Sequence, residues 1–290
     1  MKQKPYHLLP LPLFTAALLI LPLAAWAQDA PSEESAEEPE MDWGQYVETF
    51  GWSREGTGEL SQRATIEIPQ GYRFTNGAGA AQLMEAYGNR PSGNEQGLIA
   101  PEDLDWCVLF RFDPQGYVKD DEKDNLDAGK LLKTLQDGQE QANQQRVTHG
   151  LDTLTITGWA MEPNYNTITN NLEWALTLVD SSGGQTVNLN TKILGRKGIM
   201  ESVLICDPED LEAVTPVYQG LLTGYTYVQG ERYADFQKGD NIAKIGLTGL
   251  IVGGAGIAAW KWGGQLIKPL LIGLAAVGAG IAKFFGRGKN

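Results

Sequence analysis

Aromatic side chains are concentrated in one stretch whose residue types are typical of a binding site. Residues 158–178 read GWAMEPNYNTITNNLEWALTL and place Trp159 and Trp174 on either side of Pro163 and Tyr165. Such rings can stack on a sugar, a peptidoglycan fragment or a proline-rich segment of a partner. The alternative is a corner of the hydrophobic core, with the indole N–H and phenol O–H bonded locally. We favour the core corner and retain these four residues as candidate binding residues.

The carboxylates near these rings are poorly placed for hydrolysis. They are Glu162 and Glu173, and strand alternation points Glu173 away from the face that carries Trp174. A glycosidase needs two carboxyl groups on one side of its substrate. Another acidic stretch, GYVKDDEKDN at residues 116–125, lacks the glycine and the closing glutamate of a calcium loop. We therefore interpret it as a solvated approach to a helix.

Histidine and cysteine are too few for the common metal and nucleophile sites. Apart from His7 near the N-terminus, the sole histidine is His149, in a predicted loop with no nucleophile motif beside it. Cys107 and Cys206 either form a disulfide in an oxidising compartment or are both buried in the core. The GAGIAA motif at residues 254–259 lacks the strand and acid of a dinucleotide site. We predict no catalytic residues, no metal and no cofactor.

Hydrophobic patterning predicts the elements that must position these residues. Alternation and turn signals indicate an antiparallel four-stranded meander over residues 151–159, 172–178, 185–193 and 199–206. Other strands are predicted at 64–69 and 106–112, and helices at 78–87, 126–146 and 207–222. Asp127 or Asn125 is expected to cap the second helix, and Asp207 the third. The expected fold class is α+β, a meander packed with helices, followed by C-terminal transmembrane helical segments.

The start of the chain resembles a secretory signal. Lys2 and Lys4 precede an apolar stretch that ends in the A-x-A sequence at residues 25–27. The expected organisation is a signal peptide at 1–27, an acidic disordered leader at 28–42, a periplasmic α+β domain at 43–240 and a glycine-rich membrane anchor at 241–290.

The predicted anchor contains two apolar runs, residues 245–260 and 266–281. Each has about 16 residues, slightly fewer than the roughly 20 that cross a bilayer. Gly249 and Gly253 have the GxxxG spacing that allows close packing of membrane helices. Basic residues lie both between and after the runs, so one span and two spans both agree with the positive-inside rule. Because the net charge is −13 and residues 241–290 contain no acid, the middle domain is acidic, and we expect no nucleic-acid partner.

Several motifs together resemble a family of uncharacterised membrane-anchored proteins of Gram-negative bacteria, a domain of unknown function. They cover most of residues 60–255 and read IEIPQGYRF, YGNRP, GYVKDD, GWAMEPNYNTITNNLEWA, LGRKG and GERYADFQKGDNIAKIGLTGLIVGG. The resemblance implies an envelope location, a periplasmic domain and a C-terminal membrane anchor, and we expect the anchor to lie in the inner membrane of a Gram-negative bacterium. It brings no set of catalytic residues. Asn166 stands where the family pattern usually has aspartate, which weakens any carboxylate role there.

We therefore expect a non-enzymatic interaction or envelope-maintenance module attached to the lipid bilayer. Its partner is expected to be an envelope protein or a second copy of the chain. One alternative is a small-ligand or glycan binder, or a hydrolase, that uses Trp159, Tyr165 and Trp174. The other is an oligomeric membrane-active protein that acts through the glycine-rich hairpin of residues 241–290.

Overall fold

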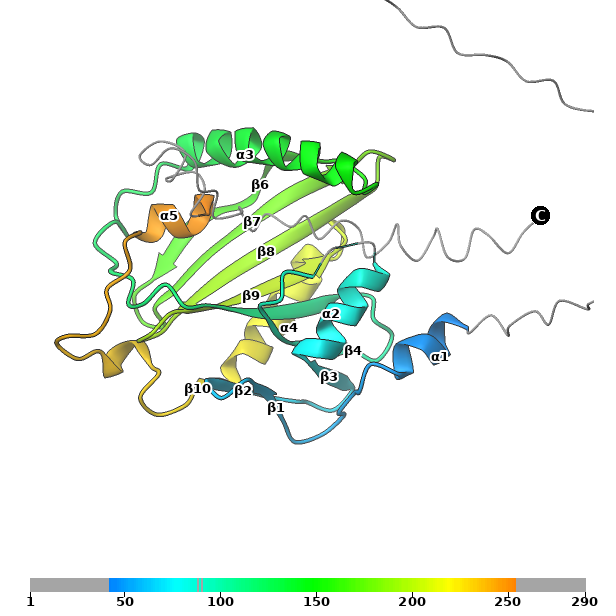
Figure 1. The fold of residues 1–290 in the computed structure, drawn as a ribbon, viewed down its shortest axis with the longest axis horizontal. Helices are drawn as coiled ribbons and strands as arrows, with labels where there is room; N and C mark the ends of the chain where they lie inside the picture. Colours follow the sequence, from blue (N-terminus) through cyan, green and yellow to red (C-terminus); the bar gives the residue numbers. More distant parts are fainter. Residues whose placement is uncertain (1–41, 88, 90, 254–290) are drawn as a thin grey trace, which may run out of the picture. The chain divides into compact units, whose positions relative to one another are not determined.

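The computed structural model describes residues 42–253, except residues 88 and 90, and contains two antiparallel sheets (Figure 1). The larger sheet has seven strands in the order β3 (Tyr72–Asn76), β4 (Glu95–Pro101), β5 (Cys107–Asp113), β9 (Ile199–Cys206), β8 (Gln185–Leu194), β7 (Asn171–Asp180) and β6 (Leu154–Asn166). The smaller sheet has the order β1 (Thr57–Leu60), β2 (Ala64–Glu67) and β10 (Tyr225–Tyr227).

This architecture contradicts the predicted fold class. The chain is mostly β-sheet with few helices, where we predicted an α+β domain around a four-stranded meander. Strands β6 to β9 are the four that were expected, but β5, β4 and β3 continue the sheet beyond β9. The EQGLIAP sequence of β4 contains glycine and proline and only three consecutive apolar residues, which is why no strand was predicted there.

The predicted transmembrane helices find no support in the described residues, none of whose helices is long and apolar enough to cross a membrane. The second apolar run, residues 266–281, and the last part of the first, residues 254–260, lie outside the described part of the chain. The start of the first run forms the short helix α5 (Leu247–Val252), which has buried side chains.

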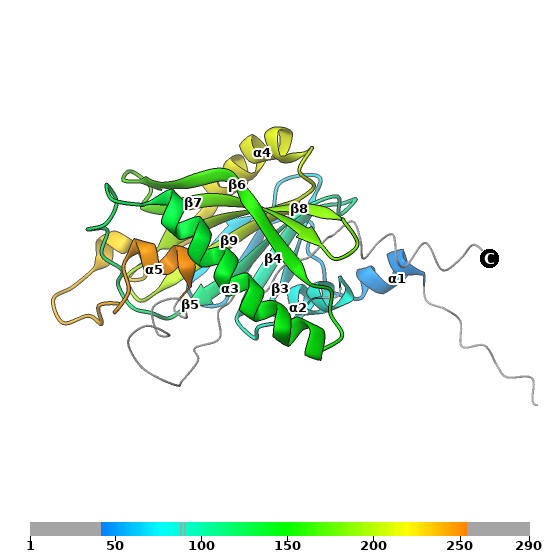
Figure 2. The same cartoon turned by 90° about the horizontal axis from the view of Figure 1, so that it is seen from above.

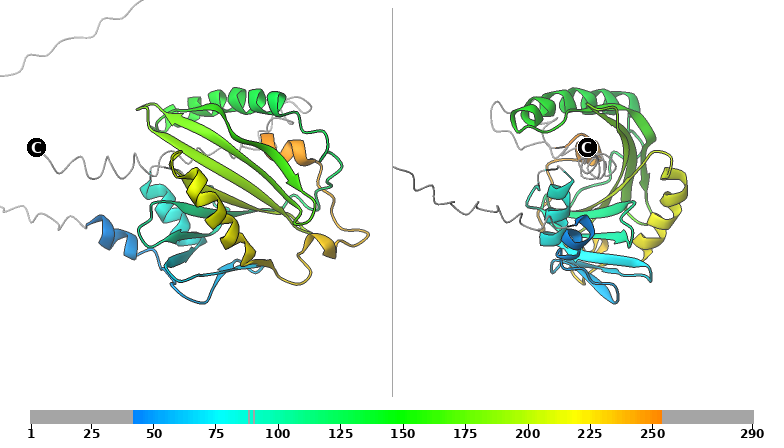
Figure 3. Two further views of the ribbon diagram at one scale, coloured as in Figure 1. Left: turned by 180° about the vertical axis from the view of Figure 1, so that it is seen from behind. Right: turned by 90° about the vertical axis from the view of Figure 1, so that its right-hand side faces the viewer.

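Helices cover both faces of the larger sheet. Helices α2 (Gly77–Ala86), α3 (Ala128–Thr148) and α5 lie on one face, and α4 (Leu211–Thr223) and the smaller sheet lie on the other (Figure 3). Seen from above, α3 crosses the strands on one side of the sheet and α4 lies on the opposite side (Figure 2). The remaining helices are α1 (Trp43–Glu48), packed near α2, and the 3₁₀ turn η1 (Tyr233–Asp235).

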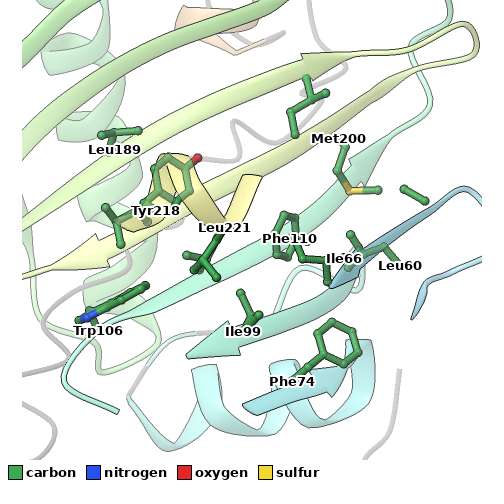
Figure 4. Packing of buried hydrophobic residues seen from close by; sticks show 14 of the residues in the cluster. Leu60, Ile66, Phe74, Ile99, Trp106, Phe110, Leu189, Met200, Tyr218 and Leu221 are labelled. Carbon is green, nitrogen blue, oxygen red and sulfur yellow. The ribbon is translucent and has the colours of Figure 1, made fainter. Parts of the chain in front are cut away.

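Strand β9 is buried on both faces because it lies in the middle of the larger sheet. Its side chains alternate, so Met200 and Leu204 face α4 while Val203 and Ile205 face α2. On the α4 side, Tyr218 and Leu221 pack with Phe110 and Met200 (Figure 4).

Beneath α4, the buried hydroxyl of one tyrosine lies within hydrogen-bonding distance of the hydroxyls of Thr191 and Ser202. The hydroxyl of Tyr218 donates to Thr191 Oγ1 at 2.7 Å and lies 3.1 Å from Ser202 Oγ. Tyr218 is itself fully buried. These three buried hydroxyls therefore bond to one another, as is usual for buried polar groups.

An aspartate precedes the first residue of both α3 and α4, as predicted, but α4 begins later than expected. Asp127 caps α3, since its carboxylate accepts from the backbone N–H of Lys130 at 3.0 Å. Helix α4 begins at Leu211 with Asp210 as N-cap, three residues later than predicted. The backbone N–H of Asp210 donates to the carbonyl of Asp207 at 3.1 Å, so the acidic segment forms a turn before the helix starts.

The folded domain continues past the predicted boundary at residue 240. Ile242 forms an isolated β-bridge with Tyr117, and the backbone N–H of Thr248 donates to Glu122 Oε2 at 2.7 Å. Helix α5 then packs beside α3 on the larger sheet. The domain therefore includes the first residues of the segment that we assigned to the anchor.

Candidate functional site

The aromatic residues of the predicted corner lie in one hydrophobic cluster beneath α3 and α5. Trp174 of β7 is only 3% exposed. Trp159 of β6 is half-buried, and its indole Nε1 donates to the carbonyl of Ala128 at 3.1 Å. Each indole thus has the contacts of a core residue, which favours the interpretation of this region as a corner of the core.

Pro163 and Tyr165 belong to a strand, although we predicted a loop between the tryptophans. Strand β6 continues to Asn166, and its pairing with β7 is irregular between Met161 and Asn164. Proline is accommodated there because β6 is the edge strand and the pairing is interrupted at that point. The hydroxyl of Tyr165 accepts from Asn170 Nδ2 at 3.1 Å, so it too is bonded locally.

The two nearby carboxylates lie apart from this cluster. Glu173 is on the opposite face of β7, where Thr191 Oγ1 lies 3.4 Å from its Oε1. Glu162 is exposed. The structure therefore brings together the aromatic residues but not a carboxylate pair.

Cys107 and Cys206 are free and buried. Their strands β5 and β9 are neighbours, but the side chains belong to clusters on opposite faces of the sheet. A disulfide between them is therefore not formed. Burial raises the pKa of each thiol to about 12, so both behave as small core residues.

The two glycines predicted to pack membrane helices lie in or next to α5. Gly249 is buried in α5, and Gly253 ends that helix with a φ of 74°. Their role in packing membrane helices stays a prediction. Among residues 42–253, with the two gaps noted above, no group of three His, Cys, Asp or Glu side chains is placed to hold a metal ion.

A row of charged side chains crosses the middle of the larger sheet, on the face that carries α2, α3 and α5. Arg111 of β5, Glu201 of β9 and Lys192 of β8 occupy directly opposed positions on neighbouring strands. Arg111 Nη2 lies 3.1 Å from Glu201 Oε2, and Lys192 Nζ donates to Glu201 Oε1. The three residues, which we call the ion row, are 5%, 8% and 7% exposed, respectively.

Burial and mutual attraction set the protonation of the ion row. Burial lowers the pKa of Lys192, although Glu201 partly opposes this effect. Burial alone raises the pKa of Glu201, but Lys192 and Arg111 outweigh it, so the net shift is downward. The neighbouring Asp113 has a raised pKa because it is buried and faces the negative charge of Glu201. The arrangement therefore favours one ionised carboxylate held between two cations.

The ion row also leaves hydrogen-bonding groups unused. Within the part of the chain that the structure describes, Arg111 Nε, Glu201 Oε2 and, on the adjacent strand β8, Asn188 Oδ1 are buried without a hydrogen-bond partner. Buried polar atoms are rarely left in this state, so each one calls for an explanation. Lys192 Nζ also lies 5.6 Å from the ring centroid of Trp174, which connects the ion row to the aromatic cluster.

Sequence patterning did not identify the ion row because Arg111 lies far along the chain from Lys192 and Glu201, which face each other across one hairpin. The three meet through the strand order β5-β9-β8, in which the β5–β9 pairing joins segments about 90 residues apart in sequence. A local signal was present, since Arg111 and Glu201 are single charges inside the apolar sequences WCVLFRF and IMESVLIC. A charge at an inward position of a central strand is the pattern that could have indicated the site.

Exposed apolar side chains occur at one end of the domain, where the β6–β7 turn and the segment before α5 lie (Figure 1). Ile168 in the turn is 90% exposed, and Phe236 and Ile242 are 37% and 44% exposed. The ring of Tyr117 stacks on Tyr233 at 4.4 Å and lies 4.2 Å from the ring of Phe236. We call Ile168, Phe236 and Ile242 the loop end.

Comparisons with known proteins identify a family but no activity. A family model described as "Protein of unknown function (DUF2167)" matches residues 53–283. No characterised protein matches the chain in sequence. One similar solved structure is the solution structure of cyanobacterial PsbP (CyanoP) from Synechocystis sp. PCC 6803, with 10% identity over 57% of this chain and 86% of that chain and a TM-score of 0.35. A TM-score this low supports no inference about function.

Proposed function

The chain belongs to the DUF2167 family, whose function is unknown, and we propose that it is a non-enzymatic interaction module of the cell envelope. It docks a partner protein at the loop end. The observation that carries the proposal is Ile168, a large apolar side chain with 90% of its surface exposed. Exposed apolar side chains that gather in one region are typical of protein interfaces.

The turn that carries Ile168 is held in one conformation. Asn166 Oδ1 accepts from the backbone N–H groups of Ile168 and Thr169, at 2.9 and 3.2 Å. Asn170, which adopts a φ of 55°, donates its side-chain amide to Tyr165. Little conformational freedom remains in the turn to be lost on binding, and such preorganisation favours association.

Phe236 and Ile242 are restrained in a comparable way. Asp240 lies between them, and Arg196 binds its carboxylate through Nε and Nη2 at 2.7 and 2.9 Å. One of the same oxygens accepts from the backbone N–H of Gln237 at 2.7 Å. The loop end thus consists of apolar side chains on restrained backbone, the type of surface in which a few residues dominate binding.

We propose further that the domain lies in the periplasm and is held at the inner membrane of a Gram-negative bacterium, with lipid as a second partner. The support comes from the sequence: the signal-like residues 1–27, and a basic and apolar segment at 241–290 without any acid. The partner at the loop end is then an envelope protein or a second copy of this chain.

Photo-crosslinking in living cells tests the docking proposal. A photoreactive amino acid at position 168 should give a discrete protein adduct, identified by mass spectrometry. The matched control is position 147, because Val147 is also apolar and 63% exposed but lies at the end of α3, away from the loop end (Figure 1). The substitution Phe236→Ser should reduce the adduct at 168. Because the lost ring packs on Tyr117, thermal unfolding of this variant is measured beside it to show that the domain stays folded.

The adduct also identifies the partner. A product with twice the mass of the chain would mean that a second copy docks there. Equal adducts from positions 168 and 147, or crosslinks confined to the chain itself, would refute docking at the loop end.

A further inference from the structure

We infer that the chain forms a dimer through β1, whose free edge pairs with β1 of a second copy in antiparallel orientation. Strand β1 is one outer strand of the smaller sheet (Figure 1). The other is β10, which has three residues and leads along the chain toward Phe236 of the loop end. Pairing through β1 therefore uses a different surface from the docking site proposed above and does not depend on it.

The backbone groups of every second residue in β1 point away from the sheet. Gly56 accepts from the N–H of Ile68 at 3.0 Å, which fixes the phase of the ladder between β1 and β2. Because bonded pairs alternate with non-bonded pairs in an antiparallel ladder, Gly58 bonds to β2 whereas Thr57 and Glu59 do not. Both of these residues are exposed. Their N–H and C=O groups therefore face outward along the edge of the sheet.

The residues opposite them on β2 confirm this direction. Glu67, which is opposite Thr57, donates its N–H to the carbonyl of Gly224, next to β10, at 3.1 Å. Thr65, which is opposite Glu59, pairs with β10 on its other side. These two residues of β2 thus bond to β10, and β1 keeps an unused row of donors and acceptors.

Both outer strands of the larger sheet, in contrast, have covered backbone groups. On β3, Phe74 exchanges two hydrogen bonds of 2.8 Å with Ser53. On β6, the side-chain amide of Asn143 accepts from the N–H of Leu154 at 2.9 Å and donates to its C=O at 2.7 Å, as a neighbouring strand would. Proteins cover exposed edges in such ways because a free edge pairs readily with another chain. Among the described residues, β1 has no comparable cover, which favours a partner strand.

A second copy of β1 fits this edge because the strand is complementary to itself. When two copies pair around Gly58, Thr57 of each copy lies opposite Glu59 of the other. These are the residues whose backbone groups face outward, so the two pairs form four hydrogen bonds. Each carboxylate then faces a threonine hydroxyl instead of a second carboxylate, which avoids the repulsion of like charges on opposed strands.

Gly58 and Leu60 hold β1 in position for this pairing. Leu60 is fully buried, and the ring of Phe74 fills the space beside Gly58, where a Cβ atom would lie 2.6 Å from the ring. The strand thus alternates between residues fixed on the core and residues exposed to solvent. Its edge is preorganised, so little conformational freedom is lost when a second strand pairs with it.

Disulfide crosslinking of the purified full chain tests the register. Thr57→Cys and Glu59→Cys should crosslink when the two variants are mixed, because their Cα atoms would lie about 5.5 Å apart. Neither variant should crosslink alone, since like positions are offset by two residues along the strands. The unmodified chain, in which Cys107 and Cys206 are buried, gives the background. Absence of crosslinks in the mixture, or equal crosslinking of either variant alone, would overturn the proposed pairing.

Analytical ultracentrifugation of the full chain measures the dimer itself. The contact is small, so we expect a weak dimer that is populated at about 100 µM. Glu59→Pro removes an outward N–H from each copy, and thus two of the four hydrogen bonds, without removing a bond to β2. It should weaken association at least about tenfold. The control Glu59→Gln keeps the N–H and should dimerise at least as well as the unmodified chain.

Circular dichroism shows whether Glu59→Pro is folded, and crosslinking decides the question if it is not, because both cysteine variants change exposed positions only. A monomer at about 100 µM would refute the dimer, since an edge that pairs with itself must associate at this concentration. A dimer that a folded Glu59→Pro leaves unchanged would show that the copies associate elsewhere, for example at the loop end.

Discussion

Glu173 is a single carboxyl group that weakens the folded state at neutral pH. It is half-buried on the face of β7 that carries α4, and Thr191 Oγ1 lies 3.4 Å from its Oε1. Burial raises its pKa above the ordinary value of 4.5. The folded state thus binds the proton more tightly than the unfolded state. Protonation of Glu173 therefore stabilises the folded state. This stabilisation is complete below about pH 4 and is lost as the pH rises through the folded-state pKa.

Glu173→Gln should therefore stabilise the domain at pH 7 and have little effect near pH 4. The amide keeps the size of the side chain but removes the charge that burial opposes. Urea unfolding at both pH values measures the difference, and Glu162→Gln serves as the control because Glu162 is exposed on the neighbouring strand β6. A lower urea midpoint at pH 7, or an equal gain at both pH values, would contradict the assignment of this effect to burial.

At the scale of elements, α5 stabilises the sheet face beneath α3. Leu250 is 6% exposed and belongs to the same cluster as Trp174. Leu250→Ala leaves a cavity there and should lower the free energy of unfolding by about 2–5 kcal/mol. Chemical denaturation measures this loss, and Val147→Ala, at an exposed position, should change the free energy by less than about 0.5 kcal/mol. Equal small effects would mean that α5 is not part of the core.

Strand faces could be predicted from the sequence, but the extent of the sheet could not. Trp106, Val108, Phe110 and Phe112 were expected on one face of a strand, and all four lie in the cluster that packs against α4. Alternation is a local property, so it survives in the fold. The pairing of β5 with β9 is non-local, because α3 and the strands β6, β7 and β8 lie between the two in the chain. No local pattern carries that information.

The same distinction explains the candidate sites. The aromatic corner was visible because Trp159, Tyr165 and Trp174 are close in sequence, and the structure places them in one cluster. The ion row was not visible because its register depends on two strand pairings. For Cys107 and Cys206 the sequence left a disulfide open. Their strands are neighbours in the sheet, but the alternation of side chains along each strand places the two thiols on opposite faces.

At the scale of the whole molecule, the position of the domain boundary can be tested with fragments. Four side chains of α5 are buried: Leu247, Leu250, Ile251 and Val252. Burying each stabilises the fold by about 1.5–3 kcal/mol, and together they approach the roughly 5–15 kcal/mol that separates a folded domain from its unfolded state. Removing them should therefore have a large effect.

We expect a fragment of residues 42–253 to unfold cooperatively, and a fragment of residues 42–240 to be largely unfolded or loosely packed. The shorter fragment also loses two backbone hydrogen bonds, from Tyr117 N–H to Asn241 and from Ala243 N–H to Tyr117, each 2.8 Å long. Circular dichroism during heating and the fluorescence of a dye that binds exposed apolar surface measure the difference. Equal unfolding temperatures would place the boundary at residue 240. A large difference would mean that part of the apolar segment 245–260 stabilises the domain itself and is unavailable for anchoring.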